Sequence, residues 1–489
     1  MRNKKDIVLV ILLSLLFIAA NSFYTYRQSS ILSLIPFVLL VGMWVFFAPT
    51  KLFYGLAFLV PLSVSLRKIV PGLSFDFWFP TEPMLVFLLL MLILKSFKDH
   101  FFQKELLRHP VFISMLFYLG WLLISVVPSE MPVVSIKYFL VRFWFIGIFF
   151  YLAYFLFKQN TKNIKLFLAL FTAGLAIVAV FSIIKQSTTA GLLNHHAAYK
   201  SASPFFVDHT SYGATLAFTI PFIGVLALNA KRGIFKFLGW GFTIFLASAL
   251  IFSYSRAAWL SLLLAIGVWF FIYFKIKFRT VVIAGALLTG LFFSFQHEIK
   301  WRLERNTTDS SGDLAEHIKS MYNIRSDASN LERINRWDAA WDMFCERPLF
   351  GWGPGTYQFV YAPFQKSQNL TIISTNFGNW GNAHSEYLGL MSEAGLPSVL
   401  AFISIWVFAL LAGFKLIKKT NISREHRNLT IACLMGLITY ISHAFLNNFL
   451  DMDKIAAPFW GSMAIILALE YHYKELGNSS VDDLTKFES

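Results

Sequence analysis

The chain has 489 residues, of which 57% are hydrophobic and only 14% are charged. Soluble domains carry about a quarter charged residues, so the composition excludes an ordinary soluble domain and predicts a polytopic membrane protein. The net charge of +15 does not indicate a nucleic-acid surface, because Lys and Arg lie mostly in short segments between apolar stretches. The two cysteines, Cys345 and Cys433, predict no disulfide framework.

Apolar segments of the length that crosses a bilayer, about 17–25 residues, recur along the chain. We interpret the first as a membrane helix rather than a cleaved signal peptide, because residues 19–22 make a poor cleavage site. The third is short and contains Pro61, so it is a candidate re-entrant segment. The expected fold is therefore all-α, a polytopic membrane bundle of about 12–14 transmembrane helices. The fourteen segments are 6–24, 30–48, 51–66, 80–97, 111–127, 136–157, 163–184, 210–229, 234–252, 256–274, 280–296, 385–414, 429–449 and 455–472.

The distribution of Lys and Arg predicts the orientation of these segments. With the N-terminus in the cytoplasm, the short inside loops hold 22 Lys and Arg and the short outside loops hold 8. Both chain ends are then cytoplasmic, and the one long polar loop lies outside the membrane and caps the bundle. The expected domains are an N-terminal transmembrane bundle of about 11 segments, a periplasmic loop with short helices, and C-terminal helices with a short cytoplasmic tail. Their bounds are 1–296, 297–384 and 385–489.

The stretch 331–397 holds a dense set of Arg, His, Trp, Gly and Pro. Apolar residues at steps of three or four predict an amphipathic helix, and they are Leu331, Ile334, Trp337, Trp341 and Phe344. The glycine turn, residues 351–355 with the sequence Gly-Trp-Gly-Pro-Gly, ends this helix and predicts exposed backbone N–H groups that suit an anion. His384 then stands at the start of a long apolar segment.

These motifs resemble the O-antigen ligase family of bacterial envelope glycan transferases, which also includes polymerases. Two positions depart from the family pattern, because Ser385 stands where Asn is common and Ser398 where Gly often follows the Pro. The matching residues are Ser253-Tyr254-Ser255-Arg256, Arg333-x-x-x-Trp337, Ala339-Ala340, Pro348-Leu349, Gly351-x-Gly353-Pro354-Gly355, His384-x-x-x-Leu388 and Glu393-x-Gly395-Leu396-Pro397.

The resemblance implies a membrane glycosyltransferase of the bacterial inner membrane, with its active site facing the periplasm. It would move a glycan from undecaprenyl diphosphate to an acceptor hydroxyl, either on lipid A–core in a ligase or on another lipid-linked repeat in a polymerase. A flippase for lipid-linked oligosaccharides is a weaker alternative, because transporters place charges near the midplane. We expect no cofactor or metal, since the chain has no nucleotide-binding glycine loop and Asp451-x-Asp453 is a weak metal motif.

The predicted topology gathers the candidate site residues near the outer face of the membrane. His384, at the family's motif position, is the expected catalytic base, because a His with a pKa of about 6.5 accepts a proton at neutral pH. Fixed Arg side chains stabilise the charge that develops on a leaving diphosphate. The expected diphosphate ligands are Arg256, Arg333, Arg142 and Arg336, and the residues expected on the acceptor side are Asp208, His209 and His443.

Each of these assignments has a structural alternative. Arg142 lies near the end of its segment and can snorkel to the interface. Arg256 can anchor a helix end, and His384 can be a structural residue at a helix end. Arg333 and Arg336 can form the solvated face of the helix in the polar loop.

Overall fold

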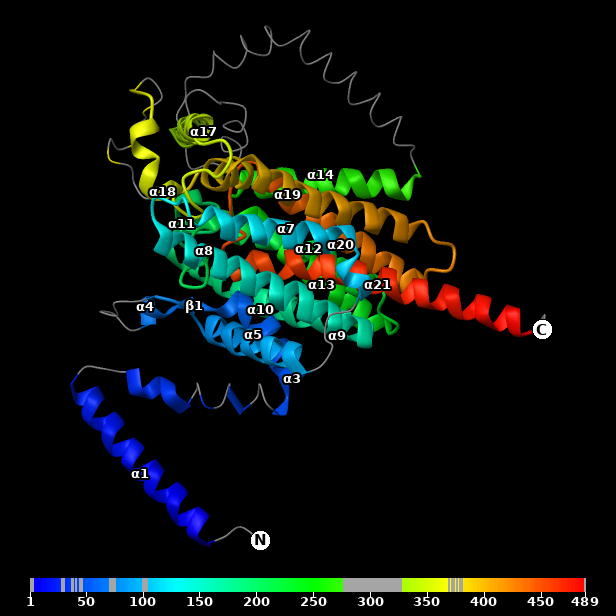
Figure 1. The fold of residues 1–489 in the computed structure, drawn as a ribbon, viewed down its shortest axis with the longest axis horizontal. Helices are drawn as coiled ribbons and strands as arrows, with labels where there is room; N and C mark the ends of the chain where they lie inside the picture. Colours follow the sequence, from blue (N-terminus) through cyan, green and yellow to red (C-terminus); the bar gives the residue numbers. More distant parts are fainter. Residues whose placement is uncertain are drawn as a thin grey trace.

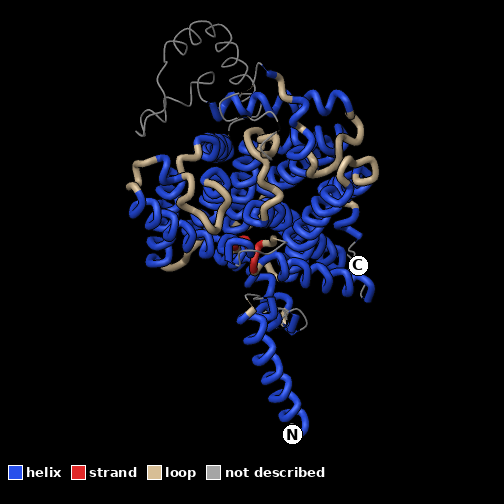
Figure 2. Tube along the Cα trace, turned by 90° about the vertical axis from the view of Figure 1, so that its left-hand side faces the viewer, coloured by secondary structure: helices blue, strands red, loops and turns tan. Residues whose placement is uncertain are grey.

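The computed structural model of the protein describes residues 4–27, 31–36, 39, 42–43, 47–69, 76–98, 104–275, 328–367, 370, 374, 377 and 381–487. The regular structure of these residues is helical apart from one antiparallel pair of two-residue strands, β1 (Val64–Ser65) and β2 (Trp78–Phe79). The predicted all-α polytopic bundle is therefore confirmed. In Figure 1 the helices lie side by side, and α1 (Lys4–Tyr26) stands apart from them. The turned view in Figure 2 shows this first helix projecting from the body of the bundle.

Besides α1, the α-helices of seven or more residues make up most of the described structure. They are α3 (Pro49–Leu59), α5 (Thr81–Lys98), α7 (Pro110–Ser125), α8 (Pro132–Phe145), α9 (Ala153–Gln159), α10 (Lys162–Thr189), α12 (His209–Leu228), α13 (Gly233–Phe252), α14 (Arg256–Tyr273), α17 (Ala328–Glu346), α19 (Glu386–Ile417), α20 (Arg424–His443) and α21 (Asp453–Phe487). Shorter elements join them, namely η1 (Ile31–Leu34), η2 (Val60–Leu62), α4 (Leu66–Ile69), α6 (Lys104–Leu107), the π-helical η3 (Ile146–Leu152), α11 (His195–Ala198), α18 (Tyr357–Val360) and η4 (Ala362–Phe364).

Seven of the described helices are long and apolar enough to cross a membrane. Other predicted segments also form helices, but α5, α20 and α21 carry charged residues within their bounds. The third segment is short, as expected, since α3 passes at Val60 into η2 and then into β1. The predicted segment 280–296 and parts of 30–48 lie outside the described residues, so the total number of spans stays a prediction.

The core of the bundle is built around α21. Its residues from Ile455 to Leu469 are nearly all buried, and the Trp460 side chain is fully enclosed. This helix packs against α9, η3, α19 and α20. The outward faces of α13 and α14 instead carry exposed apolar side chains such as Leu238, Ile244 and Leu263. An apolar outer surface around a buried core is what a lipid environment requires.

One end of the bundle carries the polar segments that follow α14. There α17 and α18 lie beside the start of α19 (Figure 1). A kink divides α19 at Gly395, whose φ of 73° and ψ of −178° are not helical, and Pro397 follows. The short first part of α19 therefore belongs to this end of the molecule, and the part beyond Gly395 runs into the bundle.

Candidate functional site at the start of α19

The helix predicted at 331–344 is present as α17, but its buried face differs from the predicted apolar stripe. Trp341 is 51% exposed, whereas Glu332 and Arg336 are buried. Buried Ala339, Ala340 and Met343 share that inner side, and they pack with Tyr357 and Tyr361 into a small separate core. Polar side chains can occupy this face because the following loop satisfies their hydrogen-bonding groups.

The glycine turn packs against the first part of α19 through backbone hydrogen bonds. The N–H groups of Trp352 and Gly353 donate to the carbonyl oxygens of Ser392 (3.0 Å) and Glu393 (2.8 Å). The N–H of Tyr357 donates to the Glu393 carboxylate at 3.0 Å. The two family motifs Gly351-x-Gly353-Pro354-Gly355 and Glu393-x-Gly395 are therefore parts of one interlocked loop. Its backbone N–H groups are committed to Glu393 and to neighbouring carbonyls.

Gly395→Ala should destabilise the fold, because this backbone conformation is nearly restricted to glycine and costs about 1–3 kcal/mol otherwise. A Cβ at this position would also lie 2.0 Å from the Leu349 carbonyl oxygen. We expect a lower unfolding temperature for the purified protein in detergent. Gly267→Ala on α14 is the matched control, since a Cβ there meets nothing within 4 Å. Equal unfolding temperatures for the two variants would contradict the interlocked loop.

His384 is held in an unusual backbone conformation directly before α19. Its φ of 49° lies in the left-handed region, which non-glycine residues seldom adopt and which often marks functional sites. Its N–H donates to the Asn382 side-chain oxygen at 3.1 Å, and its carbonyl accepts from the Trp337 indole N–H at 3.2 Å. The Ser385 hydroxyl then caps α19 by accepting from Leu388. Three local contacts thus fix the position from which the imidazole projects.

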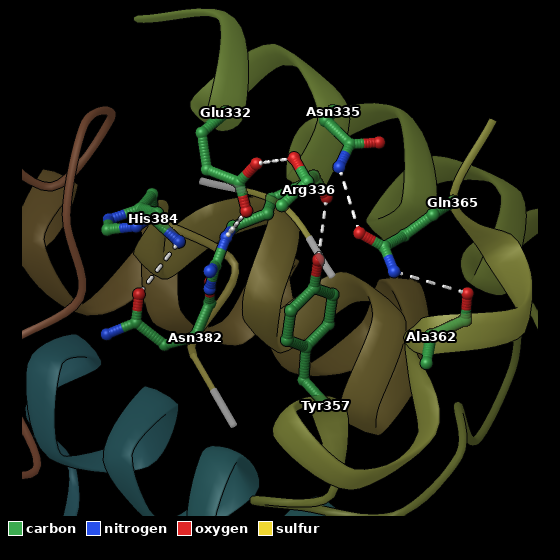
Figure 3. Close-up of polar contacts among 9 residues, drawn as sticks. Glu332, Asn335, Arg336, Tyr357, Ala362, Gln365, Asn382 and His384 are labelled. Atoms are coloured by element: carbon green, nitrogen blue, oxygen red, sulfur yellow. Dashed lines mark hydrogen bonds and ion pairs between the residues drawn. The ribbon is translucent and has the colours of Figure 1, made fainter. Parts of the chain in front are cut away.

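Arg336 supports the segment that leads into His384. Its Nε donates to Glu332 at 2.9 Å, and its Nη1 donates to the Asn382 carbonyl oxygen at 2.8 Å (Figure 3). The Tyr357 hydroxyl donates to the Arg336 carbonyl oxygen at 2.9 Å, so the loop core is tied to the same residue. The solvated-face alternative for Arg336 is wrong, because its side chain is only 4% exposed.

The surroundings of His384 keep its imidazole neutral. Burial, together with the positive charges of Arg336 and Arg333, lowers its pKa to about 3, although a hydrogen bond with Asn447 and the charge of Asp208 act in the opposite direction. The ring therefore carries a lone pair at neutral pH, but its basicity in the unliganded protein is far below the ordinary value expected from the sequence. The structure brings Arg333, Arg336 and Asp208 close enough to act on one histidine.

The end of α20 supplies a further part of this site. His443 is fully buried, and its Nε2 lies 3.0 Å from Nδ2 of Asn447. The His443 ring also lies beside the backbone of Ala257, next to Arg256. Sequence reasoning included His443 but missed Asn447. The only signal was an amide pair, Asn447-Asn448, within the apolar segment 429–449.

The elements that carry the remaining candidates lie at the same end. Arg256 is the first residue of α14, after Tyr254 with its left-handed φ of 53°. Asp208 caps α12, since its carboxylate accepts from the backbone N–H groups of Thr210 (2.8 Å) and Ser211 (2.7 Å). The His209 ring packs on Tyr199, with 4.5 Å between ring centroids. Asp208 thus has a structural task beside its charge.

Arg142 occupies the interior of the bundle, below this site. Its Nη2 lies 2.7 Å from Glu386 Oε1 and 2.8 Å from the Tyr138 hydroxyl oxygen. Glu386 also accepts from the Tyr440 hydroxyl at 3.1 Å. The snorkelling alternative is wrong, because Arg142 is 2% exposed. Its guanidinium is paired with a carboxylate only two residues after His384.

In the motif Asp451-x-Asp453, the second carboxylate contacts other side chains of the protein. Asp453 accepts from the hydroxyls of Ser63 (3.1 Å) and Thr81 (2.7 Å) and pairs with Lys454 at 3.3 Å. Within the described ranges, no group of three or more His, Cys, Asp or Glu has an arrangement that suits a metal ion.

Comparison with known proteins identifies a family match over one part of the chain. Residues 241–403 match the family model described as O-antigen ligase, and this range includes Arg256, Arg333, Arg336 and His384. An uncharacterized protein of Haemophilus influenzae is 24% identical over 192 residues, which cover 39% of this chain and 45% of that protein. The chain thus spans less than half the length of this relative. Residues 241–403 form a domain of the O-antigen ligase family, as the sequence motifs indicated.

Proposed function

We propose that the protein is a glycosyltransferase of the O-antigen ligase type, which transfers a glycan from undecaprenyl diphosphate to an acceptor hydroxyl on lipid A–core. The main support is a neutral imidazole, His384, beside Arg333 and Arg336 at the start of α19. An uncharged base next to fixed positive charges is the combination that deprotonates a hydroxyl and receives an anionic leaving group.

The reaction is a single displacement at the anomeric carbon of the donor sugar. The acceptor oxygen forms the new bond to that carbon, and its proton moves to the lone pair of His384. The bond between the anomeric carbon and the diphosphate oxygen breaks, and the diphosphate leaves with the electron pair. The bond energy is already present in the donor, so the step needs no nucleotide.

Arg256 and Arg333 are the proposed diphosphate ligands. The Arg336 guanidinium already donates to Glu332 and Asn382, so we assign Arg336 a positioning role. Its positive charge also helps to attract the diphosphate. We assign Arg142 to the support of α19 through Glu386. Asp208, His209 and His443 remain proposed for the acceptor side. The bias of Lys and Arg supports a periplasmic site in the inner membrane, with residues 297–384 as the periplasmic loop between two transmembrane parts, 1–296 and 385–489.

The alternative function is an O-antigen or exopolysaccharide polymerase, which uses the same donor chemistry on a lipid-linked acceptor. Deletion of the gene separates the two: unligated lipid-linked polymer indicates a ligase, and single repeat units on the acceptor indicate a polymerase. Purified protein supplied with the lipid-linked donor and either acceptor must then form the matching product. Movement of the donor across a bilayer without any transfer would instead favour the flippase and overturn the proposal.

Arg256→Lys should impair transfer although it preserves the charge, because Lys lacks the planar fork that pairs two phosphate oxygens. Hydrogen bonds to charged groups contribute about 1.5–3 kcal/mol, so we expect a loss of about 10-fold in kcat/KM for Arg256→Lys and about 100-fold for Arg256→Ala. Arg232→Lys is the matched control. Arg232 is exposed and directly precedes the first residue of α13, whereas Arg256 follows shortly after the last residue of that helix. Wild-type rates in Arg256→Ala would remove this residue from the mechanism.

A further inference from the structure

Asn447 lies beside the buried His443 and acts on His384. Its N–H donates to the His443 carbonyl oxygen at 3.2 Å, which continues the end of α20 by one more turn. Its side-chain Nδ2 lies 3.0 Å from His443 Nε2, and both side chains are buried. An amide nitrogen only donates, so His443 Nε2 is the acceptor in this contact. The amide oxygen of Asn447 is then available for a different donor.

The Asn447 side chain also acts on the His384 imidazole, whose pKa it raises. The backbone makes this contact possible, because the N–H of Glu386 donates to the Ala444 carbonyl oxygen at 2.9 Å and joins the start of α19 to the end of α20. A raised pKa is the effect of an acceptor, so the amide oxygen of Asn447 faces a ring N–H of His384. A neutral imidazole has one N–H and one lone pair, so the lone pair lies on the opposite ring nitrogen.

We propose that Asn447 is a positioning residue that holds the ring N–H of His384 and thereby keeps the opposite nitrogen as the proton acceptor in glycan transfer. This inference rests on the proposed function. When the acceptor proton arrives, both ring nitrogens carry hydrogen, and the amide oxygen still accepts from one of them. The contact therefore stabilises the product state of the proton transfer as well as the reactive tautomer.

An amide suits this position better than a carboxylate would. The charged and titratable groups that act on His384 are Arg333 and Arg336 from α17, Asp208 at the start of α12, and His443 through Asn447. A carboxylate here would attract the two Arg side chains and compete with an anionic donor for them. A neutral oxygen orients the imidazole and leaves the positive charges to the diphosphate.

The first test measures His384 directly, without any glycan substrate. The full chain in detergent is treated with diethyl pyrocarbonate, which modifies neutral imidazoles, and modification of His384 is followed by mass spectrometry across a pH series. Asn447→Asp should move the midpoint for His384 upward by at least one pH unit, because the new carboxylate favours the protonated ring. Asn428→Ala, which removes an amide at the far end of α20, should leave the midpoint unchanged.

The second test measures transfer kinetics. Asn447→Ala should lower kcat by about 10–100-fold, the range found when a partner that orients a metal-bound histidine is removed, while KM for the donor changes by less than about 3-fold. An unchanged kcat, or an unchanged midpoint in Asn447→Asp, would overturn the positioning role. If Asn447→Ala does not fold, the near-isosteric Asn447→Asp still decides the question through the pH midpoint of His384. The wild-type protein could also fail to transfer glycan while Asn447→Asp still shifts the midpoint of His384 modification. That result would support the contact between Asn447 and His384 and reject only the proposed function.

Discussion

His384→Ala should abolish nearly all transfer while the protein still inserts, folds and binds its donor. General base catalysis typically contributes about 10²–10⁴-fold, and we expect a loss of kcat in that range. The fold should tolerate the change, because the contacts that fix this position use the backbone N–H and carbonyl of His384 rather than its ring. Donor binding should also persist, since the proposed diphosphate ligands are arginines.

The measurement uses purified protein with the lipid-linked donor and acceptor, and donor binding is measured separately. His472→Ala is the matched control, because this histidine packs against His426 in a separate cluster of α20 and α21. Transfer at the wild-type rate in His384→Ala would make His384 a structural residue. The base would then have to be sought among Asp208, His209 and His443.

The pH dependence gives this prediction a second, independent signature. In the unliganded protein the pKa of His384 is lowered to about 3, so its neutral form dominates throughout the neutral range and kcat/KM should show no limb from it there. A bound diphosphate offsets the charges of Arg333 and Arg336, which raises the pKa. The acid limb in kcat should therefore lie at higher pH than the limb in kcat/KM, and it should vanish in His384→Ala. Acid limbs at the same pH in kcat and kcat/KM would show that the bound diphosphate does not raise the pKa of His384.

The sequence was sufficient for features with a local signature. Helical spacing predicted α17, apolar length predicted the helices of the bundle, and the glycine turn was expected at the place where it occurs. The sequence did not predict which face of α17 is buried. Its inner face carries Glu332 and Arg336, and only the loop that folds back over them makes their burial favourable.

The remaining features depend on partners that are distant in the chain. The glycine turn was expected to suit an anion, and nothing local indicated that its N–H groups donate to the backbone carbonyls of Ser392 and Glu393. Asn447 has no motif spacing to His384, and it was missed. The ordinary pKa assumed for His384 ignored burial, which only the packed structure reveals. The pairing of Arg142 with Glu386 joins α8 to α19 across the bundle and has no sequence signal either.

Breaking this buried ion pair should have the largest effect on stability. Arg142→Met leaves the Glu386 carboxylate buried without its charged partner, and removal of one member of such a pair costs about 3–5 kcal/mol. We expect a lower unfolding temperature in detergent and less recovered protein. The double variant Arg142→Met with Glu386→Gln has no buried charge at these positions and keeps an acceptor for the Tyr440 hydroxyl. Most of the lost stability should return in it, since neutral replacements of a buried pair are often well tolerated.

The same double variant decides between two roles for Arg142. If Arg142 supports α19, as we propose, the folded double variant should bind the lipid-linked donor within about 3-fold of the wild type, because its Arg256 and Arg333 are intact. If Arg142 is a diphosphate ligand, as the sequence suggested, the lost charge-assisted hydrogen bonds should weaken donor binding by at least about 10-fold. Glu386→Gln alone is the necessary comparison, since it keeps Arg142 but removes the charge of its partner. A double variant that is no more stable than Arg142→Met would show that the pair is not the source of the destabilisation.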